Sequence, residues 1–323
     1  MATPVLSSVA RSGAARVLAR AALVAALAVM LLTAGCAGTK QGSGTAAAAD
    51  GPPGGDKVRL VVSRDFGAEI LRDVTVPWRD DLDVLRLLAE NAEVDTGYGG
   101  GFVKGLDGLE SNFGGASTAD AADWFYWVDG VLGDVGAADW KLRSGETVWW
   151  DYHRWADAIV VPMALHAFPR PYSGPPLTVT AARGVTGLKR WAADVGLDLE
   201  RRRGPADEPP DGGLVLATVA EAAAVSWIGD LLGSARSSLE LVTLGDAGLT
   251  LLSPAGASGP EASAVALPIS NPDDPGRPFL LVLGATYADL EEFVPRLTPE
   301  ALDAAVAVAL VDDELVRLPW QDR

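Results

Sequence analysis

The segment Asp123-Trp-Phe-Tyr-Trp-Val-Asp-Gly130 places four aromatic residues and a valine ahead of an Asp-Gly pair. An Asp-Gly pair after aromatic and β-branched residues is typical of a two-residue β-hairpin turn, so we expect a strand over Trp124–Val128. Successive side chains of a strand point to opposite faces of the sheet. Trp124 and Trp127 therefore lie on opposite faces, and the sequence raises the question of what covers the second one.

A second aromatic segment, Trp149-Trp-Asp-Tyr-His-Arg-Trp155, repeats the pattern further along the chain. Six of the ten tryptophans lie between Trp124 and Trp155. We expect a strand over Thr147–Tyr152, and one small sheet rarely buries this many rings by itself. Three explanations remain open for the surplus rings: a hydrophobic core, a platform for a flat ligand, or contact with a second domain.

The residues before the aromatic segments complete a small domain. Alternation of apolar and polar residues predicts strands over Val58–Ser63 and Ile70–Val76, joined by a turn. Leucines at three- and four-residue spacing predict a helix over Leu82–Ala92, capped by Asp80 or Asp81. A hairpin, then a helix, then further strands fit an α+β fold of the β-grasp-like type.

Five motifs in this domain, which we place at residues 57–155, carry a family resemblance. They are Tyr98-Gly-Gly-Gly-Phe-Val, Leu106-Asp-Gly-Leu, Trp124-Phe-Tyr-Trp-Val-Asp-Gly-Val, Asp134-Val-Gly-Ala and Leu142-Arg-Ser-Gly-Glu-Thr-Val-Trp-Trp. In this order they resemble the transcobalamin-like C-terminal domain family. That family is the small β-domain of vitamin B12 carriers, and it also occurs in bacterial surface lipoproteins.

The resemblance implies a protein that captures a small ligand, such as a corrinoid or another tetrapyrrole, for handover to a membrane transporter. The ligand would lie on the aromatic sheet or in the groove between two domains. Its expected contacts are Tyr98, Phe102, Trp124, Tyr126, Trp127 and Trp140. No cofactor is required for this role. The alternative is a non-catalytic structural or protein-interaction module of the cell envelope, with the rings buried in the domain contact.

The second domain, residues 158–323, alternates apolar strand-like runs with helical patterns, which predicts an α/β layered domain. Helices are expected over Gly184–Gly196, Val219–Leu232, Thr286–Leu297 and Pro299–Val308. This half is similar to the C-terminal half of actinobacterial lipoproteins that carry the same aromatic domain. That resemblance implies an architecture and no particular chemistry.

The beginning of the chain predicts where the protein is located. Residues 1–35 read as a lipoprotein signal peptide, because arginines precede an apolar stretch, Ala21–Leu32, that is short for a membrane span. The segment Leu31-Leu-Thr-Ala-Gly-Cys36 resembles a bacterial lipobox, which implies lipid modification of Cys36, the only cysteine in the chain. A flexible Gly/Ala/Pro-rich tether over residues 36–56 follows. We expect an extracytoplasmic protein that is lipid-anchored to the cell membrane; the alternatives are an ordinary secretory signal and a retained signal anchor.

Charge and histidine content exclude several functions. The formal net charge of −17 argues against a nucleic-acid partner, because phosphates would be repelled. With one cysteine and only His153 and His166, a metal site of His and Cys ligands is almost excluded, and we expect no enzyme. We expect His153 to be held by Asp151 or solvent, with axial coordination of a tetrapyrrole metal as the alternative. A cluster of Asp, His and Ser around either histidine would indicate an enzyme instead.

Overall fold

The computed structural model describes residues 56–97, 100–112, 121–155, 157–158, 161–174, 176–203, 210, 212–233, 241–245, 248–271 and 277–321. All of them belong to one compact unit of the chain. Cys36, the predicted signal peptide and all but the last residue of the predicted tether lie outside the described residues. Within the described residues, no helix is both long enough and apolar enough to cross a membrane.

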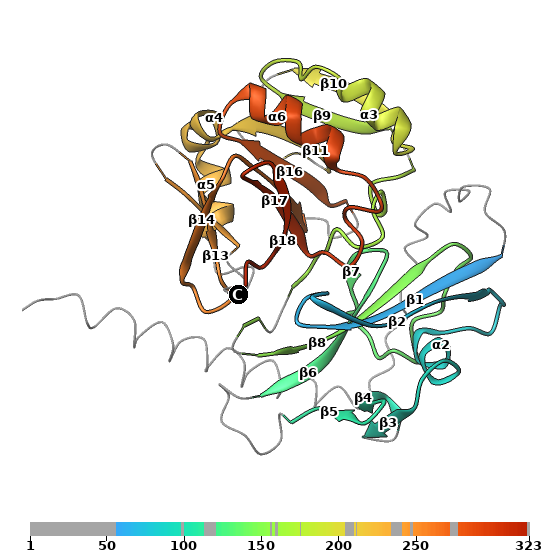
Figure 1. Ribbon diagram of the computed structural model, residues 1–323. Helices are drawn as coiled ribbons and strands as arrows, with labels where there is room; N and C mark the ends of the chain where they lie inside the picture. The colour runs from blue at the N-terminus through green and yellow to red at the C-terminus, as the bar shows by residue number, and fades with distance from the viewer. Residues whose placement is uncertain are drawn as a thin grey trace, which may run out of the picture. The chain divides into compact units, whose positions relative to one another are not determined.

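A five-stranded sheet contains both aromatic segments. Its strands are β1 (Lys57–Arg64), β2 (Glu69–Pro77), β6 (Ala122–Val128), β7 (Val131–Leu132) and β8 (Thr147–Arg154), in the order β2-β1-β8-β6-β7 (Figure 1). Strand β1 runs parallel to β8, and the other neighbours are antiparallel. The predicted hairpin turn is confirmed, since Asp129 and Gly130 have φ angles of 48° and 81° and join β6 to β7.

The two faces of this sheet are buried in different surroundings. On the first face, Trp124, Tyr126 and Trp150 pack in a cluster with apolar side chains of helix α2 (Val84–Ala89). On the second face, Trp127 and Trp149 belong to a different cluster. Most members of that second cluster come from residues after 158, so a distant part of the chain covers the second face.

Helix α2 and a short sheet follow the first hairpin of the chain. The sheet consists of β3 (Val94–Gly97), β4 (Phe102–Leu106) and β5 (Leu109–Glu110), all antiparallel. The predicted helix cap at Asp80 or Asp81 is wrong. Asp83 is the cap, because its backbone is extended and its carboxylate accepts the N–H of Arg86 at 2.8 Å.

A seven-stranded mixed sheet forms the centre of the later part of the chain. Its strands are β9 (Leu177–Ala181), β10 (Leu199–Arg203), β11 (Gly213–Thr218), β15 (Ala264–Ile269), β16 (Phe279–Gly284), β17 (Ala307–Val311) and β18 (Glu314–Leu318), in the order β10-β9-β11-β16-β15-β17-β18. The four strands β10, β9, β11 and β16 are parallel, and the remaining pairs are antiparallel.

Both faces of the seven-stranded sheet are covered. Helices α3 (Leu188–Asp194) and α6 (Tyr287–Phe293) contribute apolar side chains to the cluster on one face. The other face packs in the cluster that holds Trp127, together with α4 (Val219–Ala224) and α5 (Ser226–Gly233). A three-stranded sheet of β12 (Val242–Leu244), β13 (Leu249–Leu252) and β14 (Ser258–Ala262) also contributes to that cluster. The described residues therefore form a mixed α/β fold with several sheets and short helices.

Three of the four helices predicted after residue 158 need correction. The helix predicted over Pro299–Val308 is wrong, because turns follow Pro299 and Ala307 begins β17. The helix predicted over Val219–Leu232 is two helices, since Val225 between them has an extended backbone. The helix predicted over Thr286–Leu297 ends at Phe293, and the 3₁₀ helix η2 (Val294–Arg296) continues it.

Candidate functional site

The six predicted ligand contacts do not form one surface. Tyr98 lies outside the described residues, and Phe102 is half-buried in β4. Trp124 and Tyr126 are buried on the first face of the five-stranded sheet, whereas Trp127 is fully buried on the second. The sixth residue, Trp140, is half-buried and lines a pocket.

The rings on the first face are core residues whose polar atoms bond to the protein itself. The indole N–H of Trp124 donates to the carbonyl of Leu109 at 3.0 Å, and the Tyr126 hydroxyl donates to the carbonyl of Val135 at 2.6 Å. The Tyr126 ring also packs against Trp150, with ring centres 5.0 Å apart. Because both rings are buried in the core and both donors are used internally, neither ring offers an open face to a ligand.

Residues after 158 cover the second face, where Trp127 lies. Its side chain is 0% exposed, its ring lies 4.9 Å from that of Trp149, and its indole N–H donates to the carbonyl of Val161 at 2.8 Å. Strands β11, β15 and β16 contribute to the same cluster. The surplus rings on this face therefore pack against the later part of the chain.

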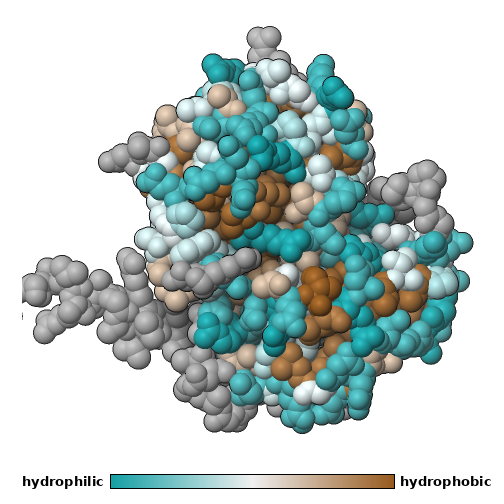
Figure 2. All heavy atoms as spheres, viewed as in Figure 1, coloured by the Kyte–Doolittle hydropathy of each residue, from teal (hydrophilic) through white to brown (hydrophobic). Residues whose placement is uncertain are grey.

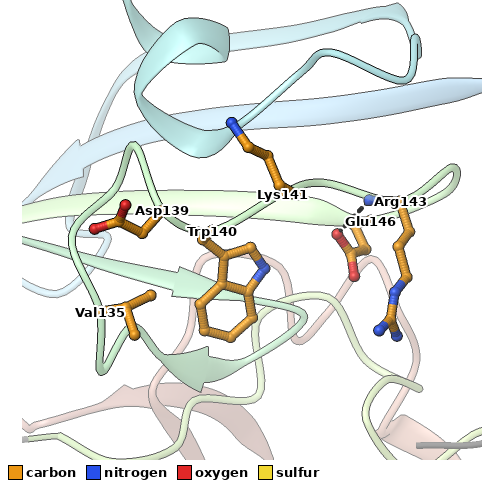
Figure 3. Close-up of a pocket in the computed structure, with 6 residues that line it drawn as sticks. All are labelled: Val135, Asp139, Trp140, Lys141, Arg143 and Glu146. Atoms are coloured by element: carbon orange, nitrogen blue, oxygen red, sulfur yellow. Dashed lines mark hydrogen bonds between the residues drawn. The ribbon is translucent and has the colours of Figure 1, made fainter. Parts of the chain in front are cut away.

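The pocket beside Trp140 has a volume of about 290 Å³. It is lined by Val135, Asp139, Trp140, Lys141, Arg143 and Glu146 (Figure 3). In Figure 3 the Trp140 ring, the Glu146 carboxyl and the Arg143 guanidinium extend to the same side of the loop, and Lys141 extends to the opposite side. The Lys141 ammonium is paired with Asp83 at 2.7 Å, so it is already occupied.

Glu146 is the buried charged residue of this pocket, at 9% exposure. Its Oε2 accepts the backbone N–H of Arg143 at 2.8 Å, and its other carboxyl oxygen has no hydrogen bond to any described residue. Burial raises the pKa of Glu146 to about 7, and the nearby charge of Asp129 acts in the same direction. A carboxyl group with this pKa gains or loses its proton near neutral pH.

A second buried polar group lies on the second face of the five-stranded sheet. Asp151 is 0% exposed and accepts four hydrogen bonds, from Ser63 Oγ at 2.6 Å, His153 Nδ1 at 2.9 Å and the backbone N–H groups of Phe66 and Gly67 at 2.9 and 3.0 Å. The ring of His153 is stacked between Phe66 and Phe125, with centres 4.3 and 4.4 Å away. The expectation that Asp151 holds His153 is confirmed.

This Ser63–Asp151–His153 cluster has the residue types of a hydrolase triad but not its connections. A nucleophile must bond to its base, and here Ser63 donates to Asp151 rather than to His153. The Ser63 hydroxyl also accepts the indole N–H of Trp149 at 2.7 Å. The carboxylate therefore fixes a turn and two side chains, and the serine is not activated.

A third polar group joins the five-stranded sheet to the later part of the chain. The Arg59 guanidinium binds Asp73 and Asp303 at distances of 2.6 to 2.9 Å. Nδ1 of the fully buried His166 accepts the backbone N–H of Ala304 at 2.9 Å and lies 3.2 Å from Asp303. Burial lowers the pKa of His166, which outweighs the opposing effect of Asp303, so the neutral ring is favoured.

Several residues of these groups were not anticipated from the sequence. Arg143 and Glu146 follow Trp140 at short spacing, and that closeness was the available local signal for the pocket. Nothing in the spacing indicates that Glu146 is buried, because its burial depends on the packing of the folded chain. Ser63 and Arg59 lie on an ordinary strand pattern, and their partners are far away in the sequence.

The described residues offer no ready metal site, and few of their large hydrophobic side chains are exposed. Among them, no three His, Cys, Asp or Glu side chains are grouped so that they could hold a metal ion. Ile70, Leu71 and Val135 are their exposed large hydrophobic residues. On the face shown in Figure 2, hydrophobic residues form patches separated by hydrophilic ones.

Comparison with known proteins relates one part of the chain to a family. No curated protein matches the chain. A crystal structure from Ruminococcus gnavus, described as that of a candidate metal-binding protein, has 15% identity and a TM-score of 0.23, and the match covers 30% of this chain and 95% of that one. Residues 81–154 match a domain family of unknown function, DUF4430, which is a transcobalamin-like family.

Proposed function

We propose that this protein is a lipid-anchored, extracytoplasmic binding protein that holds a small ligand in the pocket beside Trp140. The observation that carries the proposal is the pocket itself. Of the predicted contacts, Trp140 is the one that combines partial exposure with neighbouring polar groups, Glu146 and Arg143, that converge on the same space. An apolar ring with a few converging polar groups is the usual composition of a small-ligand site.

The size of the pocket restricts the ligand. Its volume of about 290 Å³ is at the lower end of the range of about 300–1,000 Å³ for small-molecule sites. A corrinoid or another tetrapyrrole, which the transcobalamin-like match suggests, would therefore enter with one edge or one side chain while its ring stays outside. A smaller ligand would be enclosed more completely.

The first part of the chain, up to about residue 155, has a characteristic order of strands and helix. We propose that it is a β-grasp unit, because a hairpin (β1, β2) precedes a helix and the first and last strands of the sheet lie parallel at its centre. We also propose that this unit ends near residue 155 and that an α/β unit follows it. In this arrangement the loop from β7 to β8 carries the ligand contacts.

A tetrapyrrole titration tests the ligand-binding function. The full-length chain, purified in detergent, is titrated with cobalamin and with haem, and the visible absorbance of the tetrapyrrole is followed. We expect saturable binding that Trp140→Phe weakens about tenfold or more, while Trp78→Phe, a half-buried tryptophan of the same cluster outside the pocket, leaves it unchanged. Absence of a saturable response with both compounds would reject a tetrapyrrole ligand.

The anchor is tested separately. Cys36→Ser should abolish labelling of the protein by a radioactive or clickable fatty acid in the producing cells, and it should change the fraction that sediments with membranes. Continued acylation of the variant would contradict the lipid anchor without affecting the pocket. Handover of the ligand to a membrane transporter is the part of the proposal that concerns a partner, and co-purification with a transporter subunit would support it.

A second function is favoured by the burial of Trp127 and Trp149. Their side chains are 0% exposed and pack with the later part of the chain. In this second function, the aromatic hairpin is a structural joint of a non-catalytic envelope protein that binds other proteins. This alternative predicts no saturable binding of cobalamin or haem, either by the parent chain or by the Trp140→Phe variant.

A further inference from the structure

The Trp140 pocket contains hydrogen-bond donors without partners. The indole N–H of Trp140 and the guanidinium of Arg143 make no hydrogen bond or ion pair with any described residue. Both extend to the side of the loop where the Glu146 carboxyl lies (Figure 3). In a chain with a net charge of −17, a guanidinium without a carboxylate partner beside a pocket is unusual, since most arginines of the described part are paired.

The neighbouring charges indicate how much negative charge the pocket can accept. Lys141 is occupied by Asp83, and Arg170 is occupied by Asp129 at 2.7 Å. Arg143 is therefore the one lining cation with no such partner, while Asp139 on the same rim is acidic. One available cation fits a group with a single negative charge, and a guanidinium pairs with a carboxylate in a planar, two-bond geometry.

We infer that the pocket holds its ligand by a carboxylate group, which lies between the indole N–H of Trp140 and the guanidinium of Arg143. The apolar part of the ligand packs against the Trp140 ring and Val135. This inference rests on the proposed function, because it names the chemical class of the small ligand. It excludes ligands that present an amide or an ammonium group to the same position.

Glu146 gives this binding a characteristic pH dependence. An ionised Glu146 would repel the ligand carboxylate, whereas a protonated Glu146 has a hydroxyl that can donate to it. The charged groups that influence Glu146 are Asp129, Arg143 and Arg170, and its pKa is raised to about 7 by burial. Carboxylate binding should therefore take up a proton above pH 7, and the dissociation constant should rise about tenfold per pH unit there.

Three probes with the same ring system separate the possibilities: 2-naphthoate, 2-naphthamide and 2-naphthylmethylammonium. Each is titrated into the full-length chain in detergent by isothermal titration calorimetry between pH 6 and pH 9. We expect 2-naphthoate to bind at least tenfold more tightly than 2-naphthamide at pH 6. That preference should disappear towards pH 9.

Three variants assign the effect to individual side chains. Arg143→Gln should remove the preference for the carboxylate, because the guanidinium is lost while the backbone N–H to Glu146 stays. Arg64→Gln is the matched control, with the same change of charge on an exposed side chain that pairs with Glu69 outside the pocket, and it should keep the preference. Glu146→Gln should keep the preference and remove most of its pH dependence. Circular dichroism checks that each variant is folded.

The outcomes distinguish this inference from the proposed function. Equal affinity for acid and amide, or a preference for the ammonium probe that grows with pH, overturns the carboxylate and leaves a small-ligand pocket. If none of the three probes binds at millimolar concentration, the carboxylate inference and the pocket as a ligand site are both rejected. Equal losses in Arg143→Gln and Arg64→Gln would show that a general charge effect, not the pocket, determines binding.

Discussion

The two faces of the five-stranded sheet are built from the same kinds of residues but are buried in different ways. The first face packs against helix α2 and the short sheet that lie near it in the sequence. The second face packs against residues after 158, and it also buries Ser63, Asp151 and His153. Aromatic richness alone therefore does not indicate a ligand surface, because one face forms a local core and the other a long-range joint.

The largest effect should follow truncation of the joint. Trp127→Ala removes a fully buried ring together with its hydrogen bond to Val161, and we expect a loss of about 3–5 kcal/mol in the free energy of unfolding. The measurement is urea unfolding followed by circular dichroism. Trp140→Ala, which truncates the half-buried pocket ring, is the control and should cost about 1–2 kcal/mol. Equal losses would contradict the difference in burial.

The buried carboxylate of the second face should come next. Asp151→Asn keeps the shape of the side chain but directs an NH₂ group at donors such as Ser63 Oγ or the N–H of Gly67. We expect a loss of about 2–4 kcal/mol, since a buried donor without an acceptor is costly. Asp95→Asn is the control, because Asp95 pairs with Lys104 at an exposed position and should cost less than about 1 kcal/mol.

The contact between the first hairpin and the later part of the chain can be measured with a pair of glycines. Gly67 and Gly108 have φ angles of 80° and 82°, so alanine has a similar backbone cost of about 1 kcal/mol at either position. A Cβ at Gly67 would lie 2.0 Å from the carbonyl oxygen of Ala304, whereas nothing lies within 4 Å of one at Gly108. We expect Gly67→Ala to cost about 2 kcal/mol more than Gly108→Ala in thermal or urea unfolding. A difference near zero would show that this contact is loose.

The smallest expected effect is an acid sensitivity confined to the second face. His166 is buried near Asp303, Arg59 and Asp129, and burial lowers its pKa in the folded state. Its contribution to stability is therefore fully present above its unfolded pKa of about 6.5 and is lost as pH falls through the folded value. The slope attributable to one proton is at most about 1.4 kcal/mol per pH unit.

His166→Asn separates this titration from other acid effects. Its amide oxygen can accept the N–H of Ala304 but does not titrate, so the variant should lose less stability than the parent between pH 6.5 and pH 5. Unfolding in urea at several pH values gives both slopes. Identical slopes would show that His166 does not contribute to the acid dependence.

Much of the five-stranded sheet could be predicted because its signals are local. The strand Trp124–Val128 and the Asp129-Gly130 turn follow from alternation and from the turn residues alone. The same alternation correctly separates Trp124 from Trp127, yet it contains no information about what covers Trp127. That information lies in residues after 158, which is why the sequence left core, ligand and domain contact as alternatives.

The errors in the later part of the chain have a similar origin. The run over Ala305–Val311 is apolar throughout, and periodicity cannot distinguish a strand that is buried on both faces from a helix. Val308 and Ala309 belong to different clusters on opposite faces of the sheet. Of the pocket residues, Trp140 was among the predicted contacts, but Glu146 was not, because it is polar and its burial is set by tertiary packing.

The parallel pairing of β1 with β8 has a consequence for the order in which the chain folds during synthesis. Strand β1 emerges first from the ribosome, but its partner at residues 147–154 is made only after most of this region has been translated. The contacts of the second face are completed even later. Gln321, near the end of the chain, donates to the carbonyl of Asp65 in the first hairpin. An unfinished chain therefore leaves Trp127 and Trp149 without the residues that cover them, and large apolar rings exposed in this way favour aggregation.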